Sequence, residues 1–334
     1  MELIEPSPET KNRTVIACDA STFSIIESCH YKAKLVSIDN IRSTAPNEPI
    51  DKGSLMHDML EAYYRAKRLK YKEVAPFDTM PMNEIIEKSM MIGKIKGIQT
   101  CLDISVVDEV INYFYEYCMY YANDNWQPEN VELFFSRPMY EDDSLLILWE
   151  GKIDLVFSLR QGANLLKMIS DHKTTSRAKA PHPLSNQFIG YCWALECNTV
   201  VKNEIGFQGS YKVGDRNKRH IMNYPQSLIE EWKENTIRKL LDFYYKSKDG
   251  MFLRNFSSCD RYGPCQFTEL CYTIPEAREW KLKTRYTVAE EAWSPVSKAT
   301  DQDINPFLIL DKIGKEEVWI YPTCKVDLDS LVYS

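Results

Sequence analysis

The chain has 334 residues, and 41 Lys and Arg against 48 Asp and Glu give it a net charge of −7. This length fits one large domain with embellishments or two small ones, and the acidic balance does not favour general binding of a polyanion. No apolar stretch reaches the length of a membrane span, and the polar opening MELIEPSPETKNR does not fit a signal peptide, so we expect a reducing, cytoplasmic location.

Missing motifs exclude two classes of enzyme. No G-x-x-x-x-G-K-[ST] phosphate loop is present, so these residues carry no ATP-driven helicase. No G-x-S-x-G elbow is present either, and five histidines are too few for a histidine-rich metallohydrolase site.

The first strong pattern is an amphipathic helix that begins at Gly53, in GSLMHDMLEAYYRAKRL. Ser54 is a suitable N-cap, and His57 falls in the first turn. Leu55, Leu60, Tyr63 and Tyr64 supply core contacts, so a half-buried core histidine explains His57 as well as a functional one does. Residues about 83–123 predict two more amphipathic helices.

A β-rich region follows, with strands predicted near 131–140, 145–151, 152–159, 164–170 and 204–213. Residues 145–157 (LLILWEGKIDLVF) form two β runs broken at Gly151, and Asp154 lies inside the second. A buried Asp is costly unless its charge is compensated. Asp154 is therefore either an edge residue paired with Lys152 or Lys173, or a metal ligand.

The triplet Asp171-His172-Lys173 follows the apolar run 164–170. Because strand side chains alternate, Asp171 and Lys173 project to one face and His172 to the other. An acid can bind a divalent metal, and a neighbouring amine can orient or deprotonate water, which together suit phosphodiester chemistry. Asp154 and Asp171 are candidate joint ligands of Mg²⁺ or Mn²⁺, which prefer oxygen donors.

Two features lie downstream of the triplet. Residues 183–195 predict a helix with Gln187 and Tyr191 on one face, a pair that simple helix packing also explains. Residues 202–254 carry eleven basic and seven acidic residues, and a further helix is predicted over 228–245. The densest basic loop is either a solvated hairpin tip or a phosphate-contacting edge; it contains Lys212, Arg216, Lys218 and Arg219.

Three of the ten cysteines are close together, in SSCDRYGPCQFTELC: Cys259, Cys265 and Cys271. The Pro and Gly before the middle one suit a tight loop around a metal centre, and the five-residue gaps argue against a simple zinc site. A Cys₄ iron–sulfur cluster needs a fourth ligand. Small buried side chains are expected for most of the others, namely Cys18, Cys101, Cys118, Cys192, Cys197 and Cys324. The C-terminal tail predicts a helix over 276–283 and a hairpin over 305–322.

The motif order GxxxH, GxxD, DxK, QxxxY resembles the RecB-like branch of the PD-(D/E)XK nuclease superfamily, over roughly residues 20–275. The motifs stand here as Gly53…His57, Gly151…Asp154, Asp171-His172-Lys173 and Gln187…Tyr191. One departure is Asp171, where many relatives carry Glu. The resemblance implies that Mg²⁺ or Mn²⁺ is held by His57, Asp154, Asp171 and the backbone carbonyl of His172. It also implies that Lys173 assists the attacking water and that Gln187 and Tyr191 position Lys173 or the DNA.

Within that branch, nucleases with a 4Fe–4S cluster, such as the AddB and CRISPR-associated types, take one cysteine before GxxxH and three after the core. This layout implies that the cluster ligands are Cys29, Cys259, Cys265 and Cys271. Such a cluster would tie the two ends of the core together.

The implied fold is α/β: a restriction-endonuclease-like core with a central mixed β-sheet flanked by helices. A helical N-terminal region spans 1–130, the nuclease core 131–250, the Cys-rich loop 251–275 and an extension 276–334. The expected function is that of a metal-dependent DNA exonuclease acting on single strands or DNA ends, in recombination, repair, phage replication or defence, with a helicase or recombination protein as a possible partner and no membrane. The alternative is a non-catalytic DNA-binding or assembly factor that holds DNA ends for a recombination or integration partner.

Overall fold

The computed structural model describes residues 13–43, 48–175, 182–209, 212–260, 264–289 and 302–312, and every structural statement below refers to them. Its strands are β1 (Thr14–Cys18), β2 (Ile41–Ser43), β3 (Gln127–Glu141), β4 (Leu145–Gln161), β5 (Asn164–Thr175), β6 (Thr199–Gly206), β7 (Asn217–Asn223) and β8 (Tyr286–Val288).

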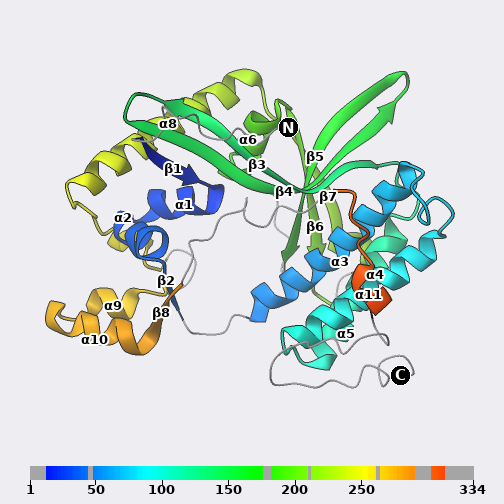
Figure 1. Cartoon of the computed structure of the whole chain (residues 1–334), viewed down its shortest axis with the longest axis horizontal. Helices are drawn as coiled ribbons and strands as arrows, with labels where there is room; N and C mark the ends of the chain where they lie inside the picture. The colour runs from blue at the N-terminus through cyan, green and yellow to red at the C-terminus, as the bar shows by residue number, and fades with distance from the viewer. Residues whose placement is uncertain are drawn as a thin grey trace.

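A mixed six-stranded sheet forms the centre of the molecule (Figure 1). The strand order is β1-β4-β5-β6-β7, and β3 also pairs with β4. The pairs β1–β4 and β5–β6 are parallel, whereas β3–β4, β4–β5 and β6–β7 are antiparallel. The predicted mixed sheet flanked by helices is therefore confirmed.

Strand β4 has two neighbours along one edge, and this arrangement opens a fork in the sheet. β1 pairs with the first part of β4, ending with Cys18 opposite Trp149. β5 pairs with the last part, from Ser170 opposite Leu155 onward, while β3 occupies the other edge. On the edge that β1 and β5 share, residues 150–154 of β4 thus have no ladder partner, whereas residues 150–153 stay paired with β3 on the other edge.

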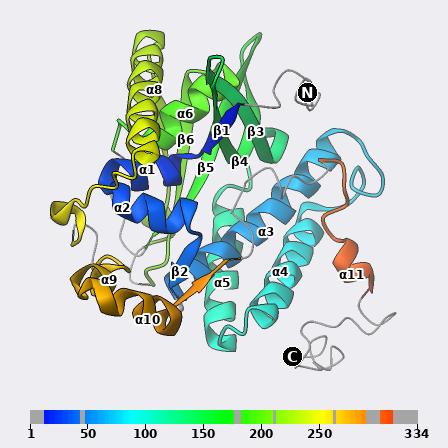
Figure 2. The same ribbon diagram turned by 60° about the vertical axis from the view of Figure 1, so that its left-hand side comes forward.

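Helices cover both faces of the sheet (Figure 2). The described helices are α1 (Ala20–Ser28), α2 (His30–Ala33), the π-helical turn η2 (Lys34–Ile38), α3 (Glu48–Tyr71), α4 (Met82–Gln99), α5 (Ile104–Tyr120), α6 (Asn186–Leu195), α7 (Val213–Arg216), α8 (Gln226–Lys248), the 3₁₀ turn η3 (Phe256–Ser258), α9 (Thr268–Tyr272), α10 (Pro275–Arg285) and α11 (Leu308–Lys312). Helices α3, α4 and α5 pack with Leu155, Phe157 and Val201 of the sheet. Helices α1, α6 and α8 pack with Val156 and Ile169 on the opposite face.

A small module joins the two ends of this core. β2 pairs with β8 in an antiparallel ladder, so that Ile41 lies opposite Val288. Beside it, Leu35 and Ile41 form a separate apolar cluster with Phe267 and Leu270. Figure 1 shows this module at the lower left, where the N-terminal helices meet α9 and α10.

Several predicted elements are confirmed and four are corrected. The helices expected over 83–123, 183–195, 228–245 and 276–283 are present as α4, α5, α6, α8 and α10. The strand predicted over 204–213 lies earlier, because β6 spans Thr199–Gly206 and Val213 begins helix α7. The predicted break at Gly151 is wrong, because β4 runs through it; a side chain there would come within 2.6 Å of Phe135, so glycine lets the sheet pack closely. Helix α3 begins at Glu48, so Ser54 lies within the helix and is not its N-cap.

The tail also differs from its prediction. The part of the expected 305–322 hairpin that is described contains helix α11, not a strand, and the rest lies outside the described residues. No helix in the described ranges combines the length and the apolar character needed to cross a membrane.

Candidate active site

The fork between β1 and β5 opens into a cavity of about 700 Å³. Carboxylates are concentrated along its wall, together with two lysines, one histidine, and the Gln and Tyr of α6. The lining includes Asp19, Asp58, Glu61, Glu132, Glu150, Asp154, Asp171, Lys152, Lys173, His57, Gln187 and Tyr191. The cavity therefore gathers every side chain of the four sequence motifs that was expected to act chemically.

Asp171 and Lys173 occupy one face of β5, as strand alternation predicts. Lys173 Nζ lies 2.8 Å from Asp171 Oδ2. The ammonium of Lys173 therefore compensates the charge of the buried Oδ2. Burial, opposed by Lys173 and reinforced by repulsion from Asp154, raises the pKa of Asp171 to about 6.

His172 projects to the other face of β5 and is held in a buried polar network. Its ring stacks on Tyr64 at 5.4 Å, and Asn203 Nδ2 lies 2.7 Å from its Nδ1. Asn203 Nδ2 also donates to the hydroxyl of Tyr117 over 2.8 Å. Burial lowers the pKa of His172 to about 3, so its ring is neutral at physiological pH.

Asp154 lies at the fork, where it is linked to both β5 and α3. The backbone N–H of His172 donates to Asp154 Oδ2 over 2.7 Å, and His57 Nδ1 lies 3.7 Å from the same oxygen. Burial opposes the charge of Asp154, but attraction to His57 and Lys173 and the hydrogen bond from His172 outweigh it, so its pKa lies below its ordinary value. The direct partners of Asp154 are thus His57 and His172. The ion pair with Lys152 or Lys173 considered from the sequence does not form.

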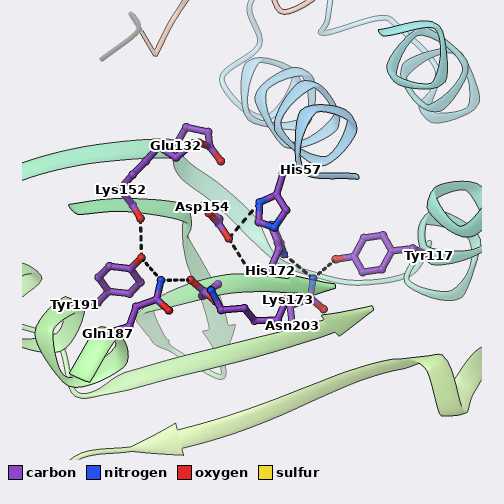
Figure 3. Close-up of polar contacts among 11 residues, drawn as sticks. His57, Tyr117, Glu132, Lys152, Asp154, His172, Lys173, Gln187, Tyr191 and Asn203 are labelled. Carbon is purple, nitrogen blue, oxygen red and sulfur yellow. Dashed lines mark hydrogen bonds and ion pairs between the residues drawn. The ribbon is translucent and has the colours of Figure 1, made fainter. Parts of the chain in front are cut away.

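His57 faces the cavity with a side chain that is 32% exposed (Figure 3). Gly53, one turn earlier, allows α3 to approach β5, because a Cβ there would lie 2.9 Å from Thr174 Oγ1. His57 is therefore not a core histidine packed away from the carboxylates.

Gln187 and Tyr191 connect α6 to β5 and β4 (Figure 3). Gln187 Nε2 lies 3.1 Å from Asp171 Oδ1 and 2.8 Å from the Tyr191 hydroxyl. That hydroxyl donates to the backbone carbonyl of Lys152 over 2.7 Å. The hydrogen bonds of Gln187 and Tyr191 therefore hold Asp171 and β4. The family resemblance had implied that the pair positions Lys173 or the DNA.

Glu132 is a cavity residue that sequence reasoning missed. It lies on β3, its side chain is 7% exposed, and it forms an ion pair with Lys152. Burial and repulsion from Asp154, opposed by Lys152, raise the pKa of Glu132 to about 8. Its backbone φ of 52° is left-handed, a conformation that costs a non-glycine residue about 1–2 kcal/mol. The signal in the sequence was an acid within the apolar run VELFF, comparable with Asp154 in KIDLVF.

The donor set at the fork fits a divalent cation. Carboxylate oxygens and one imidazole are ligands that Mg²⁺ and Mn²⁺ accept. One ligand atom from each of His57, Glu132 and Asp154 lies within 4.8 Å of the other two. Asp171 Oδ2, which pairs with Lys173, is a further carboxylate oxygen at the same cavity.

The cysteines of the predicted cluster converge on a second, small cavity in the β2–β8 module. Its walls include Cys29, Cys259, Cys265 and Cys271, together with Lys32 and Arg254. Burial, together with repulsion from Cys265 and Cys29, raises the pKa of Cys259. Of the other cysteines, Cys18, Cys118, Cys192 and Cys197 are buried as expected, Cys101 is exposed, and Cys324 lies outside the described residues.

Two residues of the basic loop are structural, not solvent-facing or free for phosphate. Arg219 lies between the rings of Tyr121 and Trp126, at 3.6 and 3.5 Å from their centroids, and bonds Asp124 Oδ2 over 2.7 Å. Arg216 is buried and pairs with Glu116 over 2.6 Å.

Comparison with known proteins identifies a family and a distant structural similarity. The family described as the PD-(D/E)XK nuclease superfamily matches residues 20–272. A solved structure described as "Crystal structure of SSO0001" aligns with 68% of this chain and 97% of its own, at 13% sequence identity and a TM-score of 0.32. Comparison with curated protein sequences finds no significant match.

Proposed function

The chain belongs to the PD-(D/E)XK nuclease superfamily, and on that premise we propose that it is a metal-dependent DNA exonuclease acting on single strands or DNA ends. The observation that carries this proposal is the fork, where Asp154, Asp171 and Lys173 meet in one cavity from two strands. A non-catalytic DNA-holding protein has no need of a buried acid pair beside a partly exposed lysine.

Each residue at the fork has a role that its contacts support. A divalent cation, when bound by Asp154, Asp171, His57 and the His172 carbonyl, supplies Lewis acidity and lowers the pKa of water. The ammonium of Lys173 lies beside Asp171 and is 39% exposed, so it can orient the attacking water and offset charge on the phosphate. Gln187 fixes Asp171 through its Oδ1, while Oδ2 pairs with Lys173.

Two features support DNA ends or single strands as the substrate. The sequence contains no helix-turn-helix, zinc finger or other module that reads bases. The cavity, although lined mainly by carboxylates, presents Lys152 and Lys173, whose side chains are 42% and 39% exposed, as two ammonium groups that can contact phosphate. Bound metal would further reduce the repulsion of a phosphate backbone.

We further propose the RecB-like branch with a 4Fe–4S cluster at Cys29, Cys259, Cys265 and Cys271. The four cysteines line one cavity although Cys29 is far from the others in sequence. The five-residue gaps between Cys259, Cys265 and Cys271 also argue against a simple zinc site.

In this proposal the chain divides into a helical region (1–130), a nuclease core (131–250), a cluster loop (251–275) and a C-terminal extension (276–334). β1 also belongs to the central sheet, so the N-terminal region contributes one strand to the core. A helicase or recombination protein is the proposed partner, since this chain carries no phosphate loop.

The experiment is degradation of single-stranded DNA labelled at the 5′ or the 3′ end, with Mg²⁺ or Mn²⁺ and with EDTA. Metal-dependent release of short products from one end is expected. Folded, metal-loaded protein that binds DNA ends without cutting any labelled substrate would instead favour the assembly factor.

A further inference from the structure

Glu132 and Asp154 face each other across the β3–β4 ladder. Their neighbours pair as Val131 with Leu155 and Leu133 with Ile153, which places the two acids at the intervening position. The left-handed φ of Glu132, 52°, interrupts the regular ladder between these pairs, and a carboxylate oxygen of Glu132 lies within 4.8 Å of one of Asp154. Both residues are buried at the wall of the cavity, so the sheet brings two acids together where little water can screen them.

The surrounding cations compensate this pair unequally. Lys152 pairs with Glu132, but its own side chain is 42% exposed and can leave without being buried elsewhere. Asp154 has His57 at 3.7 Å on its other side. The three potential ligand atoms of His57, Glu132 and Asp154 are already within 4.8 Å of one another, a separation that small side-chain rotations close around an ion.

We propose that Glu132 is a ligand of the catalytic cation in this chain, together with His57 and Asp154, and that Lys152 is its counter-ion in the metal-free protein. This inference rests on the proposed nuclease function and adds a ligand outside its four sequence motifs. Two carboxylates with an imidazole suit Mn²⁺ better than Mg²⁺, because nitrogen donors bind Mn²⁺ more readily.

The arrangement also gives Lys152 a second position. When a cation occupies the site, it competes with the Lys152 ammonium for Glu132. The Lys152 ammonium would then be free on the cavity side, where it could donate a hydrogen bond to a substrate phosphate. Its backbone stays fixed, because its carbonyl accepts the hydrogen bond from Tyr191.

The test is calorimetric titration of Mn²⁺ into the full chain, with thermal melting to confirm the fold of each variant. Glu132→Gln should weaken Mn²⁺ binding by roughly tenfold or more. Lys152→Gln should strengthen binding, or leave it unchanged, because a competing cation is removed. Glu141→Gln is the matched control: it lies at the far end of the same strand, is 57% exposed, and should bind Mn²⁺ as the wild type does.

The loss of Mn²⁺ affinity in Glu132→Gln, without such a loss in Lys152→Gln, separates a ligand from a structural ion pair. If Glu132 and Lys152 only stabilise the sheet, both variants lower the melting temperature and neither changes Mn²⁺ affinity. Folded Glu132→Gln with wild-type affinity overturns the inference, as does weaker Mn²⁺ binding by Lys152→Gln. End-labelled DNA cleavage by the same preparations distinguishes the two proposals. If Glu132→Gln binds Mn²⁺ and cuts DNA as the wild type does, Glu132 is not a ligand, but the proposed nuclease function stands.

Discussion

The backbone N–H of His172 donates a hydrogen bond to Asp154 Oδ2 over 2.7 Å, so the middle residue of the D-x-K triplet fixes the acid of the neighbouring strand. The same residue buries its ring against Tyr64 and Asn203 on the opposite face of β5. One residue therefore connects the acidic cavity to the core beneath α3 and α5.

This burial predicts a pH-dependent stability. The pKa of His172 is about 3 in the folded chain and near 6.5 when unfolded, so between these values only the unfolded chain holds the extra proton. His172 therefore destabilises the fold as the pH falls below 6.5, by about 1.4 kcal/mol per pH unit. Urea unfolding of the wild type and of His172→Asn, in EDTA at pH 7 and pH 5, should show the smaller loss in the variant. Equal losses in both proteins would mean that His172 is not buried in its neutral form.

Lys173→Ala should abolish cleavage while the fold survives, because the ammonium beside Asp171 is removed from the water-orienting position. Lys173→Ala combined with Asp171→Ala should be no more damaging than either change alone, since the residues act as a unit. Lys167→Ala, an exposed lysine on the same strand, is the control and should cleave normally. Near-normal cleavage by folded Lys173→Ala would exclude Lys173 from the mechanism.

Gln187→Ala should reduce cleavage by roughly tenfold to a hundredfold without unfolding the protein, because Asp171 Oδ1 loses its positioning donor. Tyr191→Phe should have a similar but smaller effect through loss of the bond to the Lys152 carbonyl. Mn²⁺ titration should show weaker binding by Gln187→Ala, whereas Gln226→Ala on α8 should match the wild type. If Gln187→Ala kept the wild-type Mn²⁺ affinity and cleavage rate, α6 would contribute only packing to the site.

Protein purified without oxygen should be brown and contain roughly four irons per chain, as expected for a Cys₄ cluster. Replacing Cys29, Cys259, Cys265 or Cys271 with Ser should remove iron and lower the melting temperature, because ligation ties segments from both ends of the core. Cys101→Ser and Cys118→Ser are the controls and should keep full iron content. Stoichiometric zinc without iron would contradict the cluster assignment.

Arg219→Ala should destabilise the fold by about 3 kcal/mol, because it leaves the Asp124 carboxylate, which is 7% exposed, without its closest cation. Lys212→Ala, an exposed change in the same loop, should stay within about 0.5 kcal/mol of the wild type. Urea unfolding measures both differences. If Arg219→Ala instead weakened DNA binding with unchanged stability, Arg219 would belong to the DNA contact surface.

The sequence by itself determined the features that depend on local geometry. Alternation along β5 placed Asp171 and Lys173 on one face and His172 on the other, because a strand has a two-residue repeat. The 3.6-residue period located α4, α5, α6 and α8 to within a few residues, and the order of the four motifs was sufficient to identify the superfamily.

Only the tertiary structure decided what depends on pairing between distant segments. The bond from Gln187 to Asp171, the stacking of Arg219 between Tyr121 and Trp126, and the position of Glu132 opposite Asp154 each join residues from different elements. No local pattern encodes such contacts, because strand register and helix packing are set by the burial of the whole apolar core. In the sequence alone Glu132 is an ordinary acid on a predicted strand, and only the pairing of β3 with β4 brings it beside Asp154.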